Sequence, residues 1–331
     1  MPAPPDLSVV VPVFDEAESL PELTRRIADV CEGAGFTFDV WLVDDGSRDG
    51  SWSVIEALAE RDGRFRGVRF KRNYGKSAAL AVGFERASGH YVVTMDADLQ
   101  DDPAEIPGLV AALEGTDGKG GPYDLVSGWK RTRHDPMSKT IPSRFFNAVT
   151  RYSSGIALHD FNCGLKIYRN AVVKAVRVYG ELHRYVPLLA KWEGYGRIGE
   201  KAVEHHARRF GRTKFGFERF VRGFLDLISV VFLTRFAARP MHFFGTLGSL
   251  AFLGGFVISL WISIEKVFYG KPIGDRPLLL LGVGLIVVGV QMFTTGLLGE
   301  SIIQPRMENT ARYGIAEETG GVPALATVGA R

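Results

Sequence analysis

The sequence predicts an α/β fold with a mostly parallel sheet, followed by two membrane-spanning helices. In the first two-thirds of its 331 residues, short β-branched runs alternate with stretches of helical periodicity. That alternation is the pattern of βαβ units, which build parallel sheets with right-handed crossovers. Further on, residues 243–264 and 277–299 carry no charge. Each of these runs is close to the ~20 residues that cross a bilayer.

The strands and helices of the α/β region follow one another in regular order. Apolar, β-branched runs predict strands at residues 7–14, 40–44, 68–71, 91–95 and 124–128. Helical spacing of apolar residues predicts helices at residues 16–33, 51–61, 76–87 and 103–114. In the first helix, for example, Leu20, Leu23 and Ile27 fall on one face. Beyond residue 156 the pattern is less regular.

Charge and cysteine content exclude some classes of protein. The net charge is only +3, so overall charge names no partner, and we expect no nucleic acid. Basic residues concentrate in residues 129–151 and 204–222, with six in each segment. Such clusters suit phosphates or an anionic membrane surface, although a solvated charged face is the alternative. Two cysteines, Cys31 and Cys163, imply no disulfide framework and fit a reduced compartment.

The two apolar runs predict a transmembrane hairpin; a pair of buried core helices is the alternative. Glycines along both runs would let the helices pack closely. The connection at residues 265–276 is short, so both flanks lie on the same side of the membrane. Arg235 and Arg239 precede the first run, which favours the cytoplasmic side by the positive-inside rule. Both termini are then cytoplasmic.

These patterns divide the chain into four expected parts. Residues 1–214 form the α/β domain, and residues 242–300 form the hairpin. Residues 215–241 are amphipathic and rich in arginine, which predicts helices lying in the membrane interface. A surface helix packed on the domain is the alternative. The polar and small-residue composition of residues 301–331 predicts a disordered cytoplasmic tail. The N-terminus lacks the pattern of a signal peptide.

An acidic segment follows the strand expected at residues 91–95. Alternate residues of an extended chain point the same way, so Asp96 and Asp98 can converge on one cation. Hard oxygen ligands suit Mg²⁺ or Mn²⁺, which proteins commonly share with substrate phosphates. The alternative is an acidic turn that caps the helix beginning at Pro103. This motif alone does not decide between them.

Polar residues also follow the other strands, and the carboxyl ends of parallel strands open into one crevice. The first strand carries Pro12 near its end and is followed by acidic residues. Asp44 and Asp45 end the second strand, and Lys76 follows the third. Together with the acidic segment, this set suits a nucleoside diphosphate. Neither a Walker A sequence nor a GxGxxG motif after the first strand is present, so the usual glycine-loop nucleotide sites are not supported.

Six stretches, in order, give the chain a family resemblance: VVPVFDEAESL, VDDGSRDGS, KRNYGKSAAL, MDADLQDDP, FNCGLKIYRN and HRYVPLLA. It resembles the family 2 inverting glycosyltransferases with the GT-A fold, specifically polyprenyl-phosphate glycosyltransferases of the dolichol-phosphate mannose synthase type. The resemblance covers residues 7–214, and the hairpin is similar to that of the bacterial glucosyl-transferring branch. DAD alone is a weak signal, whereas the ordered set is highly specific.

The resemblance implies roles for individual residues. The donor and its nucleotide would contact Pro12, Phe14, Glu16, Asp44, Asp45, Lys76, Asp96, Ala97, Asp98, Arg208 and Lys214. The metal, Mg²⁺ or Mn²⁺, would bind Asp96, Asp98 and Gln100. The acceptor phosphate would contact Lys130, Arg131, Arg133 and Arg144. The catalytic carboxylates would be Asp98 and Asp160, with Asp160 on the acceptor side.

The implied reaction transfers one sugar, with inversion, from a nucleotide diphosphate sugar to a polyprenyl phosphate at the cytoplasmic membrane face. UDP-glucose is the first choice of donor because of the two-span layout, and GDP-mannose is the second. Processive synthases carry QxxRW where this chain has His183-Arg184-Tyr185, which favours a single transfer. A catalytically silent, membrane-anchored binder of nucleotide sugars is the alternative of another class. A homo-oligomer is compatible with either.

Overall fold

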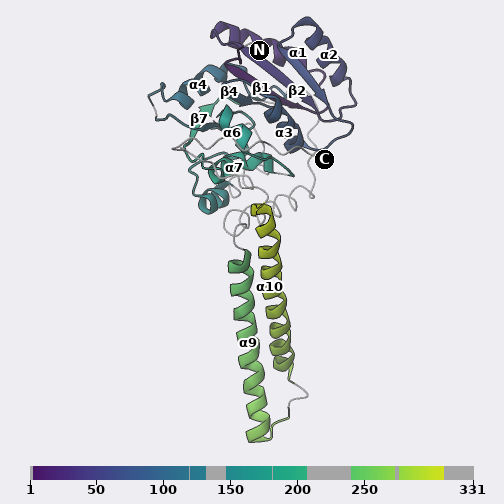
Figure 1. The fold of residues 1–331 in the computed structure, drawn as a ribbon, viewed down its shortest axis with the longest axis vertical. Coiled ribbons are helices and arrows are strands. Elements are labelled where there is room, and N and C mark those ends of the chain that lie inside the picture. The colour runs from purple at the N-terminus through teal and green to yellow at the C-terminus, as the bar shows by residue number, and fades with distance from the viewer. Residues whose placement is uncertain are drawn as a thin grey trace, which may run out of the picture. The chain divides into compact units, whose positions relative to one another are not determined.

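The computed structural model describes residues 3–118, 120–131, 147–180, 182–206, 240–272 and 276–308. The chain divides into two compact units, Met1–Ala237 and Ala238–Arg331 (Figure 1). The first contains the sheet and the second contains two long helices. The interface helices expected at residues 215–241 fall almost wholly outside the described residues.

The first unit is built on a seven-stranded sheet with the order β3-β2-β1-β4-β6-β5-β7. The strands are β1 (Leu7–Val13), β2 (Phe38–Asp44), β3 (Phe65–Arg69), β4 (Tyr91–Thr94), β5 (Leu125–Lys130), β6 (Lys166–Arg169) and β7 (Ile198–Val203). Only β6 is antiparallel to its neighbours, β4 and β5. The expected α/β fold with a mostly parallel sheet is therefore confirmed, and β1 to β4 end at one edge.

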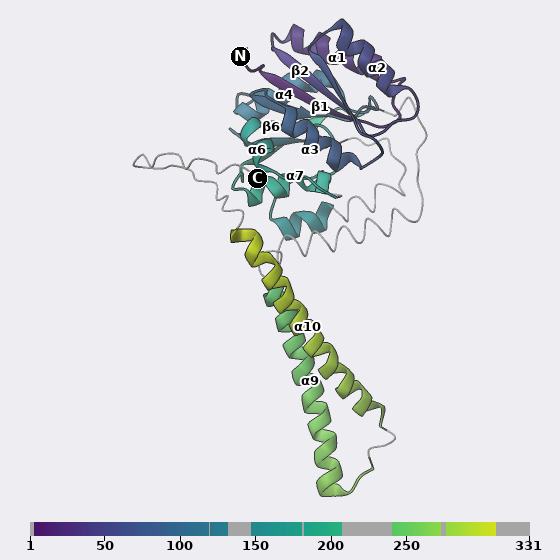
Figure 2. The same ribbon diagram turned by 45° about the vertical axis from the view of Figure 1, so that its right-hand side comes forward.

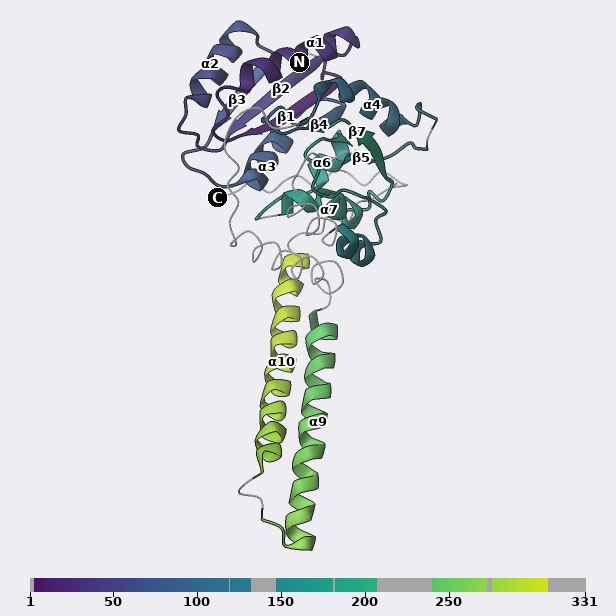
Figure 3. The same cartoon turned by 180° about the vertical axis from the view of Figure 1, so that it is seen from behind.

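Helices cover both faces of the sheet (Figures 2 and 3). They are α1 (Leu20–Gly33), α2 (Ser51–Arg61), α3 (Lys76–Arg86), η1 (Pro103–Glu105), α4 (Ile106–Glu114), α6 (Asn170–Ala175), η2 (Leu182–Tyr185) and α7 (Val186–Trp192). One hydrophobic core joins α1, α2 and α4 to the sheet, and a second joins α3, α6 and α7 to it. Val9 of β1 packs in the first core and its neighbour Val10 packs in the second, because successive side chains of a strand point to opposite faces of the sheet.

Two elements differ from the sequence-based expectation near the site. The first helix begins at Leu20 rather than residue 16, because residues 15–19 form a turn in which Leu20 N–H donates to the Glu16 carbonyl. Asp15 adopts a left-handed φ of 56° in that turn. The third strand spans Phe65–Arg69 rather than residues 68–71, since Phe65 is buried and pairs with Val40.

In the second unit, α9 (Pro240–Tyr269) and α10 (Pro277–Glu308) lie side by side (Figure 1). Both are long and apolar enough to cross a membrane. A Cβ on Gly289 would lie 2.6 Å from the Phe252 nitrogen, and one on Gly248 would lie 2.7 Å from the Gly289 carbonyl oxygen. Glycines therefore permit the close approach, as expected.

The second helix is longer than the apolar run predicted. It continues to Glu308, so residues 301–308 are helical and the disordered tail predicted from residue 301 is wrong over that stretch. The apolar run ends at Glu300, but a helix does not have to stop where its hydrophobicity stops. The rest of the predicted tail lies outside the described residues.

Candidate functional site

The loops that follow β1 and β2 are joined to each other at the carboxyl edge of the sheet. Asp15 N–H donates to Ser47 Oγ at 2.9 Å, and Arg48 N–H donates back to Asp15 Oδ1 at 2.9 Å. Gly46 (φ 76°) allows the loop after β3 to pass closely, because a Cβ there would lie 2.6 Å from the Arg72 carbonyl carbon. These three loops thus pack together and form one side of the crevice.

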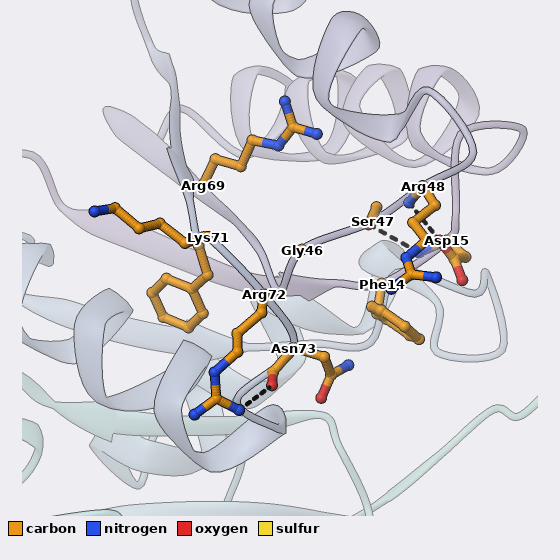
Figure 4. Close-up of a pocket in the computed structure, with 10 residues that line it drawn as sticks. Phe14, Asp15, Gly46, Ser47, Arg48, Arg69, Lys71, Arg72 and Asn73 are labelled. Atoms are coloured by element: carbon orange, nitrogen blue, oxygen red, sulfur yellow. Dashed lines mark hydrogen bonds between the residues drawn. The ribbon is translucent and has the colours of Figure 1, made fainter.

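A pocket of about 690 Å³ opens among these loops (Figure 4). Phe14, Asp15 and Arg48 lie on one side of Gly46, and basic side chains from the end of β3 and the loop after it lie on the other (Figure 4). Those basic side chains are Arg69, Lys71 and Arg72. An anionic ligand would find complementary charge here, next to the strand ends that carry Asp44 and Asp45.

Asp44 and Asp45 both lie at this edge, but both are almost fully buried. Asp44 Oδ1 accepts from Ser47 N–H at 2.9 Å, and Arg69 Nε lies 3.4 Å from Asp44 Oδ2. Asp45 accepts from the backbone N–H groups of Tyr74 at 2.6 Å and Gly75 at 2.9 Å. The two carboxylates therefore fix the shape of the loops at this edge of the sheet.

At the end of β4, Asp96 forms an ion pair with Lys76 from the first turn of α3. Burial opposes ionisation of Asp96, but Lys76 and Lys130 outweigh it and lower the Asp96 pKa to about 2. Asp98 Oδ1 accepts from Gln100 N–H at 3.2 Å, and Leu99 between them has a φ of 59°. The predicted acidic segment is thus a tight turn with an ionised carboxylate, and Ala97 is buried within it.

The oxygen-rich side chains of Asp96, Asp98 and Gln100 suit a hard divalent cation. The structure adds a neighbouring group that was not expected. Ligand atoms of Asp102, Glu204 and His206 lie within 4.8 Å of one another. Asp102 is already engaged, since its carboxylate is 2.7 Å from Arg26 and 3.0 Å from His206.

Two histidines, His205 and His206, follow β7. The structure brings them beside the acidic turn, since Asp101 and His205 form a β-bridge. His206 N–H also donates to the Gln100 carbonyl at 2.9 Å. The two segments are about a hundred residues apart in sequence, so no local pattern could reveal the contact.

Asp160 lies in the segment leading into β6 and is 1% exposed. Glu200, from β7, holds this segment: its Oε1 accepts from His159 N–H at 2.7 Å and from Asp160 N–H at 3.0 Å. Its Oε2 lies 2.6 Å from His159 Nδ1, and Trp129 stacks on the same imidazole with centroids 4.4 Å apart. Glu200 was not predicted as a site residue, because the sequence around it contains no motif that indicates a functional role.

The Asp160 segment also contacts the acidic turn directly. A Cβ on Gly164 would lie 2.7 Å from Asp96 Cγ, so any larger residue there would displace the Asp96 carboxylate. Lys166, fully buried, donates to the carbonyls of Phe161 at 3.3 Å and of Cys163. Burial raises the pKa of the Cys163 thiol to about 12, so the thiol stays protonated and packs as a small apolar side chain. The Asp160 segment and the acidic turn therefore form one wall.

The predicted phosphate-binding residues are only partly described. Lys130 forms an ion pair with Asp101, with Nζ 2.8 Å from Oδ1, and is 13% exposed. Burial lowers its pKa, but Asp101 outweighs this and raises it. Its ammonium is thus committed to the acidic turn, while the next residue, Arg131, is exposed. Arg133, Arg144, Arg208 and Lys214 lie outside the described residues, so their roles stay predictions.

Comparison with known proteins identifies the family. The model of glycosyl transferase family 2 matches residues 8–177, which contain both the acidic turn and Asp160. The chain belongs to this family. Dodecaprenyl-phosphate galacturonate synthase of Rhizobium johnstonii is 41% identical over 90% of this chain and 87% of that protein. Undecaprenyl-phosphate 4-deoxy-4-formamido-L-arabinose transferase of Pseudomonas paraeruginosa is 38% identical over 90% of this chain and 86% of its own length.

Solved structures agree on the fold of this family 2 glycosyltransferase. A glucosyl-3-phosphoglycerate synthase from Mycobacterium tuberculosis superimposes with a TM-score of 0.52 over 70% of this chain and 80% of that one. Identity is 20%, so the likeness shows the GT-A fold alone. That structure was solved with Mn²⁺, UDP-glucose and glycerol 3-phosphate. The expected GT-A fold and glycosyltransferase class are both confirmed.

Proposed function

We propose that this glycosyltransferase transfers one sugar from a nucleoside diphosphate sugar to a polyprenyl phosphate at a membrane surface. One observation carries the proposal: the Lys76–Asp96 pair and the Asp160 segment form one wall, in a chain that also has two bilayer-length helices. The two relatives named above act on dodecaprenyl and undecaprenyl phosphates by name, and each is similar over 90% of this chain.

Donor activation is the first part of the proposed mechanism. Mg²⁺ or Mn²⁺ held by Asp96, Asp98 and Gln100 would offset the negative charge that develops on the departing diphosphate. Lys76 supplies a fixed cation at the same place, and its pairing with Asp96 keeps that carboxylate ionised and ready to bind a cation. The basic pocket beside Gly46 would accept the nucleotide end of the donor, because its charge complements a phosphate.

The acceptor needs little activation. A phosphate monoester has a second pKa of about 6, so it is largely dianionic at neutral pH and is already a competent nucleophile. Asp160 is buried and its Oδ1 accepts from Asn162 N–H at 3.0 Å, which suits an orienting role more than proton abstraction. Attack on the face opposite the leaving diphosphate inverts the anomeric centre, and His183-Arg184-Tyr185 in place of QxxRW favours a single transfer.

Membrane attachment has a physical purpose in this proposal. The acceptor head group lies at the membrane surface, so anchoring the enzyme there replaces a three-dimensional search with local capture. The hairpin would place both of its flanks on the same side, and the basic residues before it favour the cytoplasmic side.

The sugar is to be decided by experiment. UDP-glucose remains the first donor to test, and GDP-mannose is retained as the second. The names of the similar proteins add galacturonate and 4-deoxy-4-formamido-L-arabinose to the panel. Purified full-length chain in detergent, with Mn²⁺ and a short polyprenyl phosphate, should yield an organic-phase sugar product with one of these donors.

The matched control is Asp96→Asn, which keeps the size of the side chain and removes its charge. We expect this variant to lose at least 100-fold in rate, as is typical when transition-state charge stabilisation is removed. If wild-type protein bound nucleotide sugars but formed no lipid product with any donor, the silent binding protein would be the correct interpretation. Product in the aqueous phase would instead indicate a non-lipid acceptor.

A further inference from the structure

We propose that His183 donates a hydrogen bond from Nε2–H to an oxygen of the transferred sugar, with its tautomer fixed by Ser77. The inference rests on the proposed function, since it concerns the donor of that reaction. His183 belongs to η2, in the segment that replaces the QxxRW motif of processive synthases. The proposal gives this residue a role in recognising the sugar.

Two contacts between His183 and Ser77 fix the imidazole. The His183 backbone N–H donates to Ser77 Oγ at 3.1 Å, and Ser77 Oγ lies 3.0 Å from His183 Nδ1. Ser77 is 1% exposed, so water cannot satisfy its hydroxyl hydrogen. Among the described residues, His183 Nδ1 is the acceptor within reach of the Ser77 hydroxyl hydrogen. Nδ1 therefore accepts, and in a neutral imidazole the proton is then on Nε2.

The imidazole is neutral under ordinary conditions. Burial lowers the pKa of His183 to about 3, and the nearby positive charges of Lys76 and Arg184 act in the same direction, against the opposing effect of Asp96. The ring thus offers one donor, Nε2–H, which makes no hydrogen bond to the described residues. The His183 side chain is only partly buried, so this donor is open to water or to a ligand oxygen.

The location of the ring indicates which part of the substrate it would contact. Ser77 follows Lys76 on α3, and Lys76 pairs with Asp96 at the diphosphate side. Asp96 in turn contacts Gly164 of the acceptor-side segment. In a group transfer, the sugar lies between the leaving diphosphate and the acceptor. A neutral donor at this junction suits a hydroxyl or carboxylate oxygen, because Lys76 and the metal already serve the phosphates.

Paired substitutions separate the two ring nitrogens. The amide nitrogen of Gln occupies the position of Nε2, whereas that of Asn occupies the position of Nδ1. We expect His183→Asn to weaken binding of the donor about 10-fold, the typical loss for a neutral hydrogen bond, while His183→Gln recovers most of that affinity. Ser77→Ala should give an intermediate loss because it frees the tautomer and the ring.

Calorimetry without acceptor makes the test independent of lipid transfer. UDP-glucose and UDP-galacturonate are titrated into full-length wild type and each variant with Mn²⁺, and UDP alone serves as the control ligand. The proposal predicts that UDP binds all variants equally, and that only UDP-sugar affinity falls in His183→Asn. The Tm of each variant, measured alongside, reports any folding defect, which would weaken UDP binding as well.

Three results would overturn the inference. These are equal UDP-sugar affinity in wild type and His183→Asn, an equal loss for UDP and UDP-sugar, and wild type that binds neither sugar nucleotide more tightly than UDP. The proposed function fails separately, if wild type binds the donor as described but forms no lipid-linked product. The two failures are therefore distinguishable.

Discussion

The buried ion pair between Lys130 and Asp101 gives the sharpest test of how the acidic turn is held. Lys130→Met removes the ammonium but keeps much of the apolar stem. It leaves Asp101, which is fully buried, with an uncompensated negative charge. The sequence-based prediction differs, since it assigned Lys130 to the acceptor phosphate.

The geometry of the ion pair sets the expected loss of stability in Lys130→Met. At 2.8 Å between Nζ and Oδ1, and with an effective dielectric constant of about 20, the attraction is about 6 kcal/mol before desolvation is counted. Lys130 is 13% exposed, so solvent screens the pair weakly. Breaking a buried pair from one side costs about 3–5 kcal/mol. For a domain of this size, that corresponds to a loss in Tm of roughly 6–20 °C.

A double-mutant cycle measures the pair directly. Thermal unfolding of the full chain in detergent, followed by tryptophan fluorescence, compares Lys130→Met, Asp101→Asn and the double variant. We expect the double variant to be more stable than Lys130→Met, because it removes both charges together. Arg131→Ala is the matched control, since this exposed neighbour should change stability by less than about 0.5 kcal/mol.

The opposite pattern would refute the structural role. If Lys130→Met left the Tm unchanged and raised the KM for polyprenyl phosphate 10-fold or more, Lys130 would contact the acceptor as the sequence predicted. A Tm loss with an unchanged acceptor KM would confirm that Lys130 acts by holding the acidic turn.

Three further predictions concern other parts of the chain. Glu200→Gln should lower kcat about 10-fold with little change in donor affinity, measured by steady-state kinetics, because the segment that carries Asp160 loses a charged acceptor; an unchanged kcat would exclude this positioning role. Gly289→Leu should lower the midpoint of SDS-induced unfolding of the hairpin, whereas Gly284→Leu, where a Cβ meets open space, should not; equal effects would contradict the packing. Because the pKa of His183 is about 3 when folded and about 6.5 when unfolded, its contribution to stability is present above pH 6.5 and is lost as the pH falls towards 3, by up to about 1.4 kcal/mol per pH unit. Denaturant titrations should show a shallower acid slope in His183→Gln, and identical slopes would refute the neutral assignment.

Much of the fold was predictable because the signals are local. A β-branched run followed by an amphipathic helix determines a βαβ unit, and parallel strands place their carboxyl ends at one edge. This is why Asp44, Lys76 and Asp96 could be assigned to one crevice from sequence. The spans were predictable for the same reason, since a bilayer requires a long uncharged run.

The errors arise where a local sequence pattern misses a distant contact or the end of a helix. The first helix begins at Leu20 because the preceding turn is hydrogen-bonded to Ser47, in the loop after β2, and to Ser51, at the start of α2. Hydrophobic periodicity does not detect such contacts. The predicted tail is helical to Glu308 because hydropathy marks the apolar part of a helix and not its end.

By itself, the sequence determined the fold class, the family resemblance and the residue types that reach the carboxyl edge of the sheet. Only the tertiary structure decided what those residues contact: Asp101 for Lys130, Glu200 for the Asp160 segment, and Ser77 for the His183 imidazole. Ser77 and His183 are 106 residues apart in sequence. They meet because α3 and η2 pack together in the same core, on one face of the sheet. Burial then determines their chemistry, because a group removed from water must find its partner within the protein.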